Sequence, residues 1–467
     1  MFNMLIQAEN EYLNFMSKQL PEIIFNDFRE AVFQPDPVVS FKIIPDKWQE
    51  KSLNVNLEKI PWSTHGYYLP VNMNFITDPL WHGGYYYVQE PSSMIIDSII
   101  SRLSKDITSP LILDFCAAPG GKTAGLLINS PSTATIVANE WNAKRRLALL
   151  ENLNRLGLDN FIVTGTHHES IQKCGPLFDI IVCDAPCSGE GLFRKIPHSV
   201  YEWSIQKVNH SAGLQLSMLQ GLWETLKPGG YLIYSTCTFN TIENENVILQ
   251  LINTTGAKNI FFDELCIDGI CNLQIQGVDA YRFFPHLSKG EGFFCCILKK
   301  SFEQTTLPNI NITQSENPLS QPYLLSYFKQ EQSLICEKNI WWAGGNLKVK
   351  SYLEKNNIQV IQNGIPVFLE KKHKVHPLQD LITHGNFNPK SLPSVDLELN
   401  DAYKYLSHAL NWQHIINRHP YFYFTYKNFP FGLAQGKTHT MVNKYPLNRK
   451  IQKRFSTGEI NTLLNFI

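Results

Sequence analysis

The sequence lacks long apolar runs and lacks cysteines at metal-binding spacing. No C-x-x-C pair occurs among its ten cysteines, which excludes a zinc ribbon or a thioredoxin-type motif. No apolar run approaches the roughly 18–20 residues that span a bilayer. The first residues, MFNMLIQAENEYLNFMSKQL, carry early acidic residues and no apolar core, unlike a signal peptide. We therefore expect a cytoplasmic protein without a membrane segment, a disulfide framework or a bound metal.

The chain also lacks net charge, with 41 basic and 41 acidic residues, but the charge is unevenly spread. From residue 301 onward there are 18 Lys and Arg against 11 Asp and Glu, and from residue 437 the counts are 6 against 1. A basic C-terminus indicates a polyanion partner such as nucleic acid. An ordinary basic surface is an equally weighted alternative on this evidence alone.

A glycine-rich loop lacks one residue of an ATP-binding signature. In LILDFCAAPGGKTAGLL, residues 111–127, a P-loop would need glycine where Cys116 stands. The G-x-G-x-x-G pattern of NAD sites is absent as well. Glu140 ends the next apolar segment, 19 residues after Gly121, a spacing that suits hydrogen bonds to ribose hydroxyls. The loop therefore favours an adenosine-bearing cofactor, with S-adenosylmethionine as the leading candidate and a structural strand-turn-helix as the alternative.

Short apolar segments alternate with amphipathic ones between residues 111 and 300. They predict six strands, at 111–115, 135–140, 161–165, 178–186, 229–237 and 291–300. This alternation is typical of an α/β fold, a Rossmann-like core whose mostly parallel sheet carries helices on both faces. A helix is also expected over about 10–34. We expect five parts: an α+β extension (1–80), the core (81–300), a polar linker (301–323), a small α+β domain (324–395) and a basic domain (396–467).

Two predicted strands end in cysteine-bearing motifs, CDAPCSGEG with Cys187 and YSTCTFNTIENE with Cys237. These strands are expected to be neighbours, so both thiols should face one cleft, although a lone strand-end cysteine is more often a buried small residue. A thiolate that adds to carbon 6 of a pyrimidine makes carbon 5 nucleophilic enough to accept a methyl group. The second cysteine then suits the base that removes the carbon 5 proton. Asp184 suits a contact with N3, for which it must be protonated or share a proton, and hence have a raised pKa.

These motifs resemble those of the RNA 5-methylcytosine methyltransferases of the NOL1/NOP2/Sun family. The resemblance covers about residues 80–300 and includes CAAPGGKT, ANE, DAPCSGEG, YSTCTFNTIENE and PHLSKGEGFF. It implies that Cys237 is the nucleophile, that Cys187 helps to release the product, and that Asp184 contacts the cytosine. The implied cofactor-binding residues are Cys116, Ala117, Ala118, Pro119, Gly120, Gly121, Lys122, Glu140 and Asp184.

The C-terminus narrows the resemblance within this family. The segment PFGLAQGKTHTMVNKYPLNRKIQ (430–452) resembles the end of the PUA-like RNA-binding domain of the bacterial RsmF (YebU) group. This implies methylation of one cytosine in 16S ribosomal RNA, in the 30S subunit or its precursor. Methylation of tRNA or another rRNA, and a noncatalytic RNA-binding ribosome-assembly factor, are the alternatives. DNA methyltransferases are disfavoured, because they use the cysteine of the P-C motif as nucleophile.

Three segments depart from the family pattern. After the third core strand, VTGTHHES places His167, with Glu169 two residues on, where the family has an acidic contact to the adenine side of the cofactor. The N-terminal strand reads PVVSFKII instead of containing Arg-Val-Asn, and FGLAQGK replaces an LGWGK-like run. These positions predict altered cofactor and RNA contacts.

Contacts to RNA are expected from basic and aromatic side chains. Phosphate contacts set affinity rather than sequence choice, and aromatic rings can stack on unpaired bases. The predicted phosphate contacts are Lys444, Arg449, Lys450, Lys453 and Arg454. The candidate stacking rings are Tyr85, Tyr86, Tyr87, Trp341, Trp342, Tyr421, Tyr423 and Tyr426, and the alternative for each is a place in the core, where most aromatic residues of strands lie.

Overall fold

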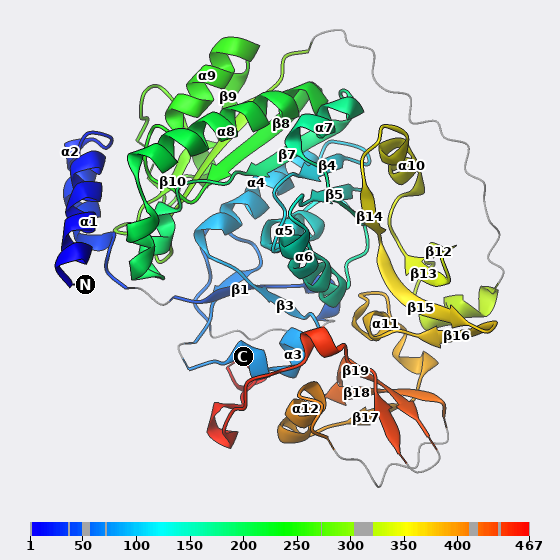
Figure 1. Cartoon of the computed structure of the whole chain (residues 1–467). Helices are drawn as coiled ribbons and strands as arrows, with labels where there is room; N and C mark the ends of the chain where they lie inside the picture. The colour runs from blue at the N-terminus through cyan, green and yellow to red at the C-terminus, as the bar shows by residue number, and fades with distance from the viewer. Residues whose placement is uncertain are drawn as a thin grey trace.

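A mixed nine-stranded sheet forms the centre of the computed structural model (Figure 1). The structure describes residues 2–35, 38–48, 57–70, 72–271, 273–302, 321–410, 419–437 and 440–466. The predicted linker, residues 301–323, lies almost wholly outside the described residues.

Five parallel strands in the order β6-β5-β4-β7-β8 make up the middle of the sheet. They are β4 (Leu111–Asp114), β5 (Thr135–Asn139), β6 (Phe161–Thr164), β7 (Phe178–Asp184) and β8 (Leu226–Thr236). Antiparallel strands β9 (Lys258–Ile260), β10 (Tyr281–Phe283) and β11 (Phe293–Lys299) extend the β8 side. The strand order reverses between β4 and β7, which is where ligands bind in such sheets. The predicted α/β Rossmann-like core is therefore confirmed.

Helices cover both faces of this sheet (Figure 1). Helices α4 (Ile95–Ser104), α5 (Gly121–Asn129) and α6 (Ala143–Leu156) lie on one face, and α7 (His168–Ile171), α8 (Ile205–Thr225), α9 (Glu245–Thr255) and α10 (Leu347–Lys355) on the other. Along β4, Ile112 packs into the first layer, whereas Leu111 and Leu113 pack into the second. This alternation follows from the two-residue period of a strand and explains why the predicted strands are apolar throughout.

The N-terminal segment forms two helices, α1 (Phe2–Met16) and α2 (Glu22–Ala31), instead of the single helix expected over about 10–34. Pro21 stands at the N-cap of α2, because proline does not continue a helix but is well tolerated at its start. Tyr12 of α1 lies edge-on to Phe193 and Trp203, with ring centroids 4.9 and 5.1 Å away. These helices therefore brace the loops that follow β7.

A separate antiparallel sheet in the order β2-β1-β3 contains β1 (Ser40–Ile43), β2 (Gly66–Tyr68) and β3 (Tyr86–Val88). Because β3 lies beyond residue 80, the predicted boundary between residues 80 and 81 is wrong: it cuts through this sheet. Phe41 and Tyr86 share one apolar cluster with Tyr405 and Phe424 of the C-terminal region. The expected N-terminal extension is thus two structures, one packed on the core and one packed on the C-terminus.

The C-terminal region contains two four-stranded sheets. The first has β12 (Leu334–Glu337), β13 (Ile340–Ala343), β15 (Ile365–Lys371) and β16 (Lys374–Pro377), and the second has β17 (Ser394–Asp396), β18 (Tyr421–Tyr426), β19 (Phe429–Gly436) and β20 (Met441–Asn443). Short helices α11 (Gln379–Thr383) and α12 (Leu399–Leu406) accompany them. Strand β14 (Val360–Asn363) pairs with β6 instead, so the boundary expected at residue 300 does not separate the sheets. Within the described residues, no helix has the length and apolarity needed to cross a membrane.

A buried ion pair joins the small sheet to the core. Lys42 of β1 is fully buried, Asp97 of α4 is 2% exposed, and the Lys42 Nζ lies 2.7 Å from both carboxylate oxygens. Burial lowers the pKa of Lys42, and Asp97 partly offsets this effect. A Cβ on Gly125 would lie 2.0 Å from Asp97 Oδ1, so α5 approaches this pair closely only because residue 125 is glycine. Lys42 belongs to the PVVSFKII segment and cannot reach RNA from this position.

Replacing Asp97 alone should therefore destabilise the protein strongly. Asp97→Ala leaves the Lys42 ammonium buried without a partner, and we expect a loss of about 3–5 kcal/mol in the free energy of unfolding measured with urea. The double variant Lys42→Met/Asp97→Leu should regain much of that loss. Glu30→Ala, which removes an exposed partner of Arg29, should change stability little. Equal losses in Asp97→Ala and Glu30→Ala would contradict this assignment.

Candidate active site

The loop predicted to hold the cofactor joins β4 to α5 at the carboxyl end of the sheet. Gly120 caps α5 in the left-handed region at φ 112°, which a residue with a side chain rarely adopts. Two side chains of α6 fix the loop from behind: Arg145 Nη2 donates to the carbonyl of Ala118, and Asn152 Nδ2 to that of Pro119, both at 2.9 Å. The loop is thus held open toward the cleft by contacts on its outer side.

Cys116, where a P-loop would have glycine, lies half-buried in the same loop. A hydrogen bond with Cys183, together with burial, raises the pKa of Cys116. Its thiol is therefore protonated near neutral pH.

Two buried carboxylates at neighbouring strand ends have an oxygen without a hydrogen-bond partner. These oxygens are Asp114 Oδ1 at the end of β4 and Glu140 Oε2 just after β5. Burial raises the pKa of Asp114 to about 7, although Thr123 Oγ1 donates to its other oxygen at 2.6 Å. The second oxygen of Glu140 accepts from the backbone N–H of Asn142 at 2.9 Å. Glu140 Oε2 does lie 3.5 Å from Arg145 Nη1, whereas Asp114 Oδ1 has neither a hydrogen bond nor an ion pair among the described residues. A buried acceptor of this kind fits a ligand that brings hydroxyl or ammonium donors, as an S-adenosylmethionine-type cofactor does.

Lys122 and Asp184 meet across the mouth of the cleft. Lys122 Nζ lies 2.8 Å from Asp184 Oδ2, and Ser235 Oγ donates to Asp184 Oδ1 at 2.8 Å. Burial alone would lower the pKa of Lys122, but the neighbouring Asp184 and Asp114 carboxylates raise it. Without a bound substrate, Asp184 is thus a hydrogen-bond acceptor on both oxygens, whereas the sequence predicted a proton-carrying carboxyl.

The two predicted thiols lie together just beyond the adjacent strands β7 and β8. The register places Asp184 beside Ser235, and Cys187 Sγ lies 3.3 Å from Cys237 Sγ. The hydrogen bond with Cys237, followed by burial, raises the pKa of Cys187. The two thiols are therefore close enough to act on one bound group.

Two buried glutamates tie the loops of the two cysteines together, and sequence reasoning did not single them out. Glu243, from the Cys237 loop, accepts from the N–H of Ser188 at 2.9 Å, next to Cys187. Glu190, from the Cys187 loop, accepts from the N–H groups of Phe239 and Asn240 at 2.7 and 3.1 Å. The sequence did contain a signal for them, because both glutamates lie inside the cysteine-bearing motifs, Glu190 in SGEG and Glu243 in TIENE.

The same pair is reinforced by side chains. Asn240 Nδ2 lies 2.7 Å from Glu190 Oε1 and 2.8 Å from Glu243 Oε1, and Gln215 Nε2 donates to Glu243 at 2.9 Å. Burial, with the nearby Glu190 carboxylate, raises the pKa of Glu243. Each glutamate accepts hydrogen bonds from the backbone of the opposite loop. The backbones of the two cysteine-bearing loops are therefore joined in both directions.

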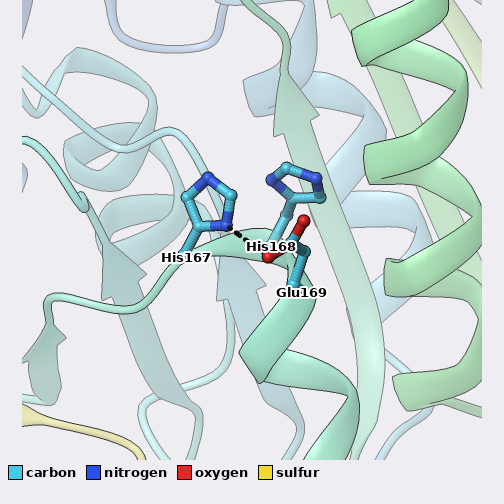
Figure 2. A group of neighbouring side chains, drawn as sticks. All are labelled: His167, His168 and Glu169. Atoms are coloured by element: carbon cyan, nitrogen blue, oxygen red, sulfur yellow. Dashed lines mark ion pairs between the residues drawn. The ribbon is translucent and has the colours of Figure 1, made fainter.

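His167 and Glu169 follow β6 and point toward one another, with the His168 ring beside them (Figure 2). His167 Nδ1 lies 3.6 Å from Glu169 Oε2, and the His167 ring lies edge-on to Trp141 at 5.7 Å. The His167 and Glu169 side chains are 46% and 79% exposed. This cluster therefore lies at the same edge of the sheet as Glu140, accessible to a ligand.

The structure corrects several predicted RNA contacts. Six of the eight candidate stacking rings are buried, namely Tyr85, Tyr86, Tyr87, Trp341, Tyr423 and Tyr426. They pack in cores and cannot stack on bases. Arg449 is also committed, because its Nη1 lies 2.6 Å from Asp380 Oδ1. Lys453 and Arg454 are exposed, and Lys444 and Lys450 are half-buried.

Comparison with known protein families agrees with this geometry. A model described as 16S rRNA methyltransferase RsmB/F matches residues 104–299, and one described as the N-terminal domain of 16S rRNA methyltransferase RsmF matches residues 9–91. Over these residues the chain belongs to the RsmB/F family. The family indicated by the cysteine motifs is therefore confirmed.

Individual relatives support the same family. Ribosomal RNA small subunit methyltransferase F of Aeromonas hydrophila is 33% identical over 266 residues, which cover 55% of this chain and 54% of the relative. The protein of the same name from Escherichia coli strain SE11 is 33% identical over 258 residues, which cover 54% and 53%. The chain thus spans about half the length of the curated relatives it matches.

Solved structures of similar fold come from Pyrococcus horikoshii. A methyltransferase homolog protein matches with a TM-score of 0.51 and 26% identity, over 60% of this chain and 92% of that one. NSun6 matches with a TM-score of 0.52 over 62% and 98%, and at 17% identity it shows the fold alone.

The geometry of the RsmB/F thiol pair makes a prediction about reactivity. Cys237→Ala removes the hydrogen bond that contributes most to the raised pKa of Cys187, so the thiolate fraction of Cys187 should rise. Alkylation of Cys187 by iodoacetamide, followed by peptide mass spectrometry, should become several-fold faster than in the wild type. The exposed Cys336 is the internal reference, and its rate should not change. An unchanged or slower Cys187 would show that Cys237 does not control its proton.

Proposed function

We propose that this protein uses S-adenosylmethionine to methylate carbon 5 of one cytosine in 16S ribosomal RNA, through a covalent bond between Cys237 and carbon 6. The observation that carries the proposal is the pair of thiols 3.3 Å apart at the ends of adjacent strands. At this distance one thiol can add to carbon 6 of a cytosine and the other can remove the proton from carbon 5 of the same ring. The RsmB/F models and the small subunit methyltransferase F relatives support the RNA class.

Cys237 begins the proposed reaction. Its thiolate adds to carbon 6 of the cytosine, and the electron pair of the 5,6 double bond moves to carbon 5. Asp184 delivers a proton to N3 during this addition, which requires that it gain a proton when the base displaces Lys122 from its carboxylate. S-adenosylmethionine supplies the methyl group that carbon 5 takes up.

Cys187 ends the proposed reaction. After methyl transfer, carbon 5 still carries its original proton, and a base must remove it before the bond between Cys237 Sγ and carbon 6 can break. Cys187, next to Cys237, is positioned to act as this base once its own proton has passed to solvent. Release restores the 5,6 double bond, frees Cys237 as a thiolate, leaves the carbon 5 proton on Cys187 and returns the N3 proton to Asp184.

The cofactor would be held along the carboxyl ends of β4 and β5. The loop from Cys116 to Lys122 offers backbone N–H groups at the start of α5, a position that favours polar ligand groups. Asp114 and Glu140 provide carboxylate oxygens that accept no hydrogen bond from the described part of the protein. His167 or Glu169 takes the adenine-side contact for which the family uses an acidic residue.

The partner would be the RNA of the 30S subunit or its precursor, which places the protein in the cytoplasm. We assign the sheet β17–β20, with the following basic segment, to a PUA-like RNA-binding domain. A target in tRNA or another rRNA would use the same chemistry, and a noncatalytic assembly factor would bind the subunit without transferring methyl groups.

Variants of the two cysteines test this proposal. With 30S subunits and labelled S-adenosylmethionine, Cys187→Ala should accumulate a labelled protein–RNA adduct on a denaturing gel, because the attached product cannot leave. Cys237→Ala should give no adduct and no methyl transfer. Cys336→Ala, which alters an exposed thiol outside the site, should behave like wild type. Activity in Cys237→Ala would refute the assigned nucleophile.

A further inference from the structure

A cavity of about 440 Å³ lies outside the reacting centre, between α3 (Pro79–His82), α6 and the C-terminal segment 445–455. Its size is in the range of small-molecule sites. It joins parts of the chain that are distant in sequence, and Figure 1 shows the red C-terminal segment passing α3. Neither Cys187 nor Cys237 lines it.

The wall of this cavity carries a buried cation without a counter-ion. Arg155 is 3% exposed and makes no ion pair within the described part of the chain. Its Nη1 donates to the carbonyl of Trp81 at 2.6 Å and its Nη2 to Asn152 Oδ1 at 3.1 Å. Burial lowers the pKa of Arg155 to about 10. A ligand anion would supply the compensation that the protein does not.

The remaining charged groups of the wall are mostly positive. Lys450 and Lys453 line the cavity, and Arg449 lines it too, but its charge is balanced by Asp380. The one acidic side chain is Glu151, which accepts from Asn448 Nδ2 at 2.6 Å. The balance of charge therefore favours an anionic ligand.

Half-buried aromatic rings complete the wall. Trp81, Phe75 and Phe455 all line the cavity and retain accessible surface. The Arg155 guanidinium lies over the Trp81 ring at 4.1 Å, and the Lys453 ammonium lies 5.0 Å from the centre of the Phe455 ring. Aromatic rings interleaved with cations are the usual surface for an unstacked nucleotide, whose base stacks while its phosphate is neutralised.

The cavity is connected to the cofactor loop. Asn152 lines it and also holds the Pro119 carbonyl at 2.9 Å. An occupant would therefore lie behind the loop that starts α5.

We propose that this cavity binds one unpaired nucleotide of the RNA substrate, with its base against Trp81 and Phe455 and its phosphate against Arg155 and Lys453. This inference rests on the proposed function for the identity of the RNA. The cavity would be a second RNA-binding site, separate from the site of the target cytosine at Cys237. Its wall combines three segments that are distant in sequence: α3, α6 and residues 445–455.

The test measures equilibrium binding of the full-length protein to 30S subunits without S-adenosylmethionine. Phe455→Ala should weaken binding about tenfold, within the range found for loss of one base stack. Phe455→Tyr should restore it, which separates stacking from folding. Phe302→Ala, which removes an 81% exposed ring outside the cavity, is the matched control. Lys453→Ala should reduce the slope of log affinity against log salt by about one.

The inference would be overturned if Phe455→Ala and Phe302→Ala bound 30S subunits with equal affinity, or if the wild type did not bind 30S subunits. It would also be overturned if Phe455→Ala bound 16S rRNA freed of ribosomal proteins as tightly as the wild type does. This last result would identify a protein ligand. Failure of the proposed function would give a different result: the wild type would bind 30S subunits but would transfer no labelled methyl group from S-adenosylmethionine to their RNA.

Discussion

The reciprocal hydrogen bonds of Glu190 and Glu243 are the constraint on which the site depends. Each carboxylate belongs to the loop of one cysteine and accepts backbone N–H groups from the loop of the other. Because both are buried, these acceptors are costly to leave unsatisfied, and the two loops are held in one arrangement. The two thiols lie 3.3 Å apart between the loops that this exchange joins.

The surrounding fold positions the two cysteine-bearing loops. Parallel pairing of β7 and β8 brings the two loops to the same edge of the sheet. Helix α1 packs Tyr12 against Phe193 and Trp203, which cover the Glu190 side. The small sheet, tied to α4 by the Lys42–Asp97 pair, and the C-terminal region share a core. The small sheet is therefore joined both to the core and to the C-terminal region.

The core could be predicted from the sequence because its strands are short apolar runs separated by polar turns, and because Cys187 and Cys237 stand at strand ends. The domain boundaries could not: β3 and β14 pair with strands far away in the chain, and local periodicity carries no information on such pairing. The partners of single side chains could not be predicted for the same reason. Tyr85 and Tyr86 were candidates for stacking on RNA, with a place in the core as the alternative, and they pack in the core, whereas Arg449 pairs with Asp380.

The central claim is that two thiols in contact perform different steps. It is tested most directly by incubating the wild-type protein with S-adenosylmethionine and 30S subunits containing 5-fluorocytidine, whose fluorine cannot be removed as a proton. Mass spectrometry of the trapped peptide then identifies the sulfur bonded to carbon 6. The account predicts methylated fluorocytosine on Cys237 and a free Cys187. A bond to Cys187 would contradict it.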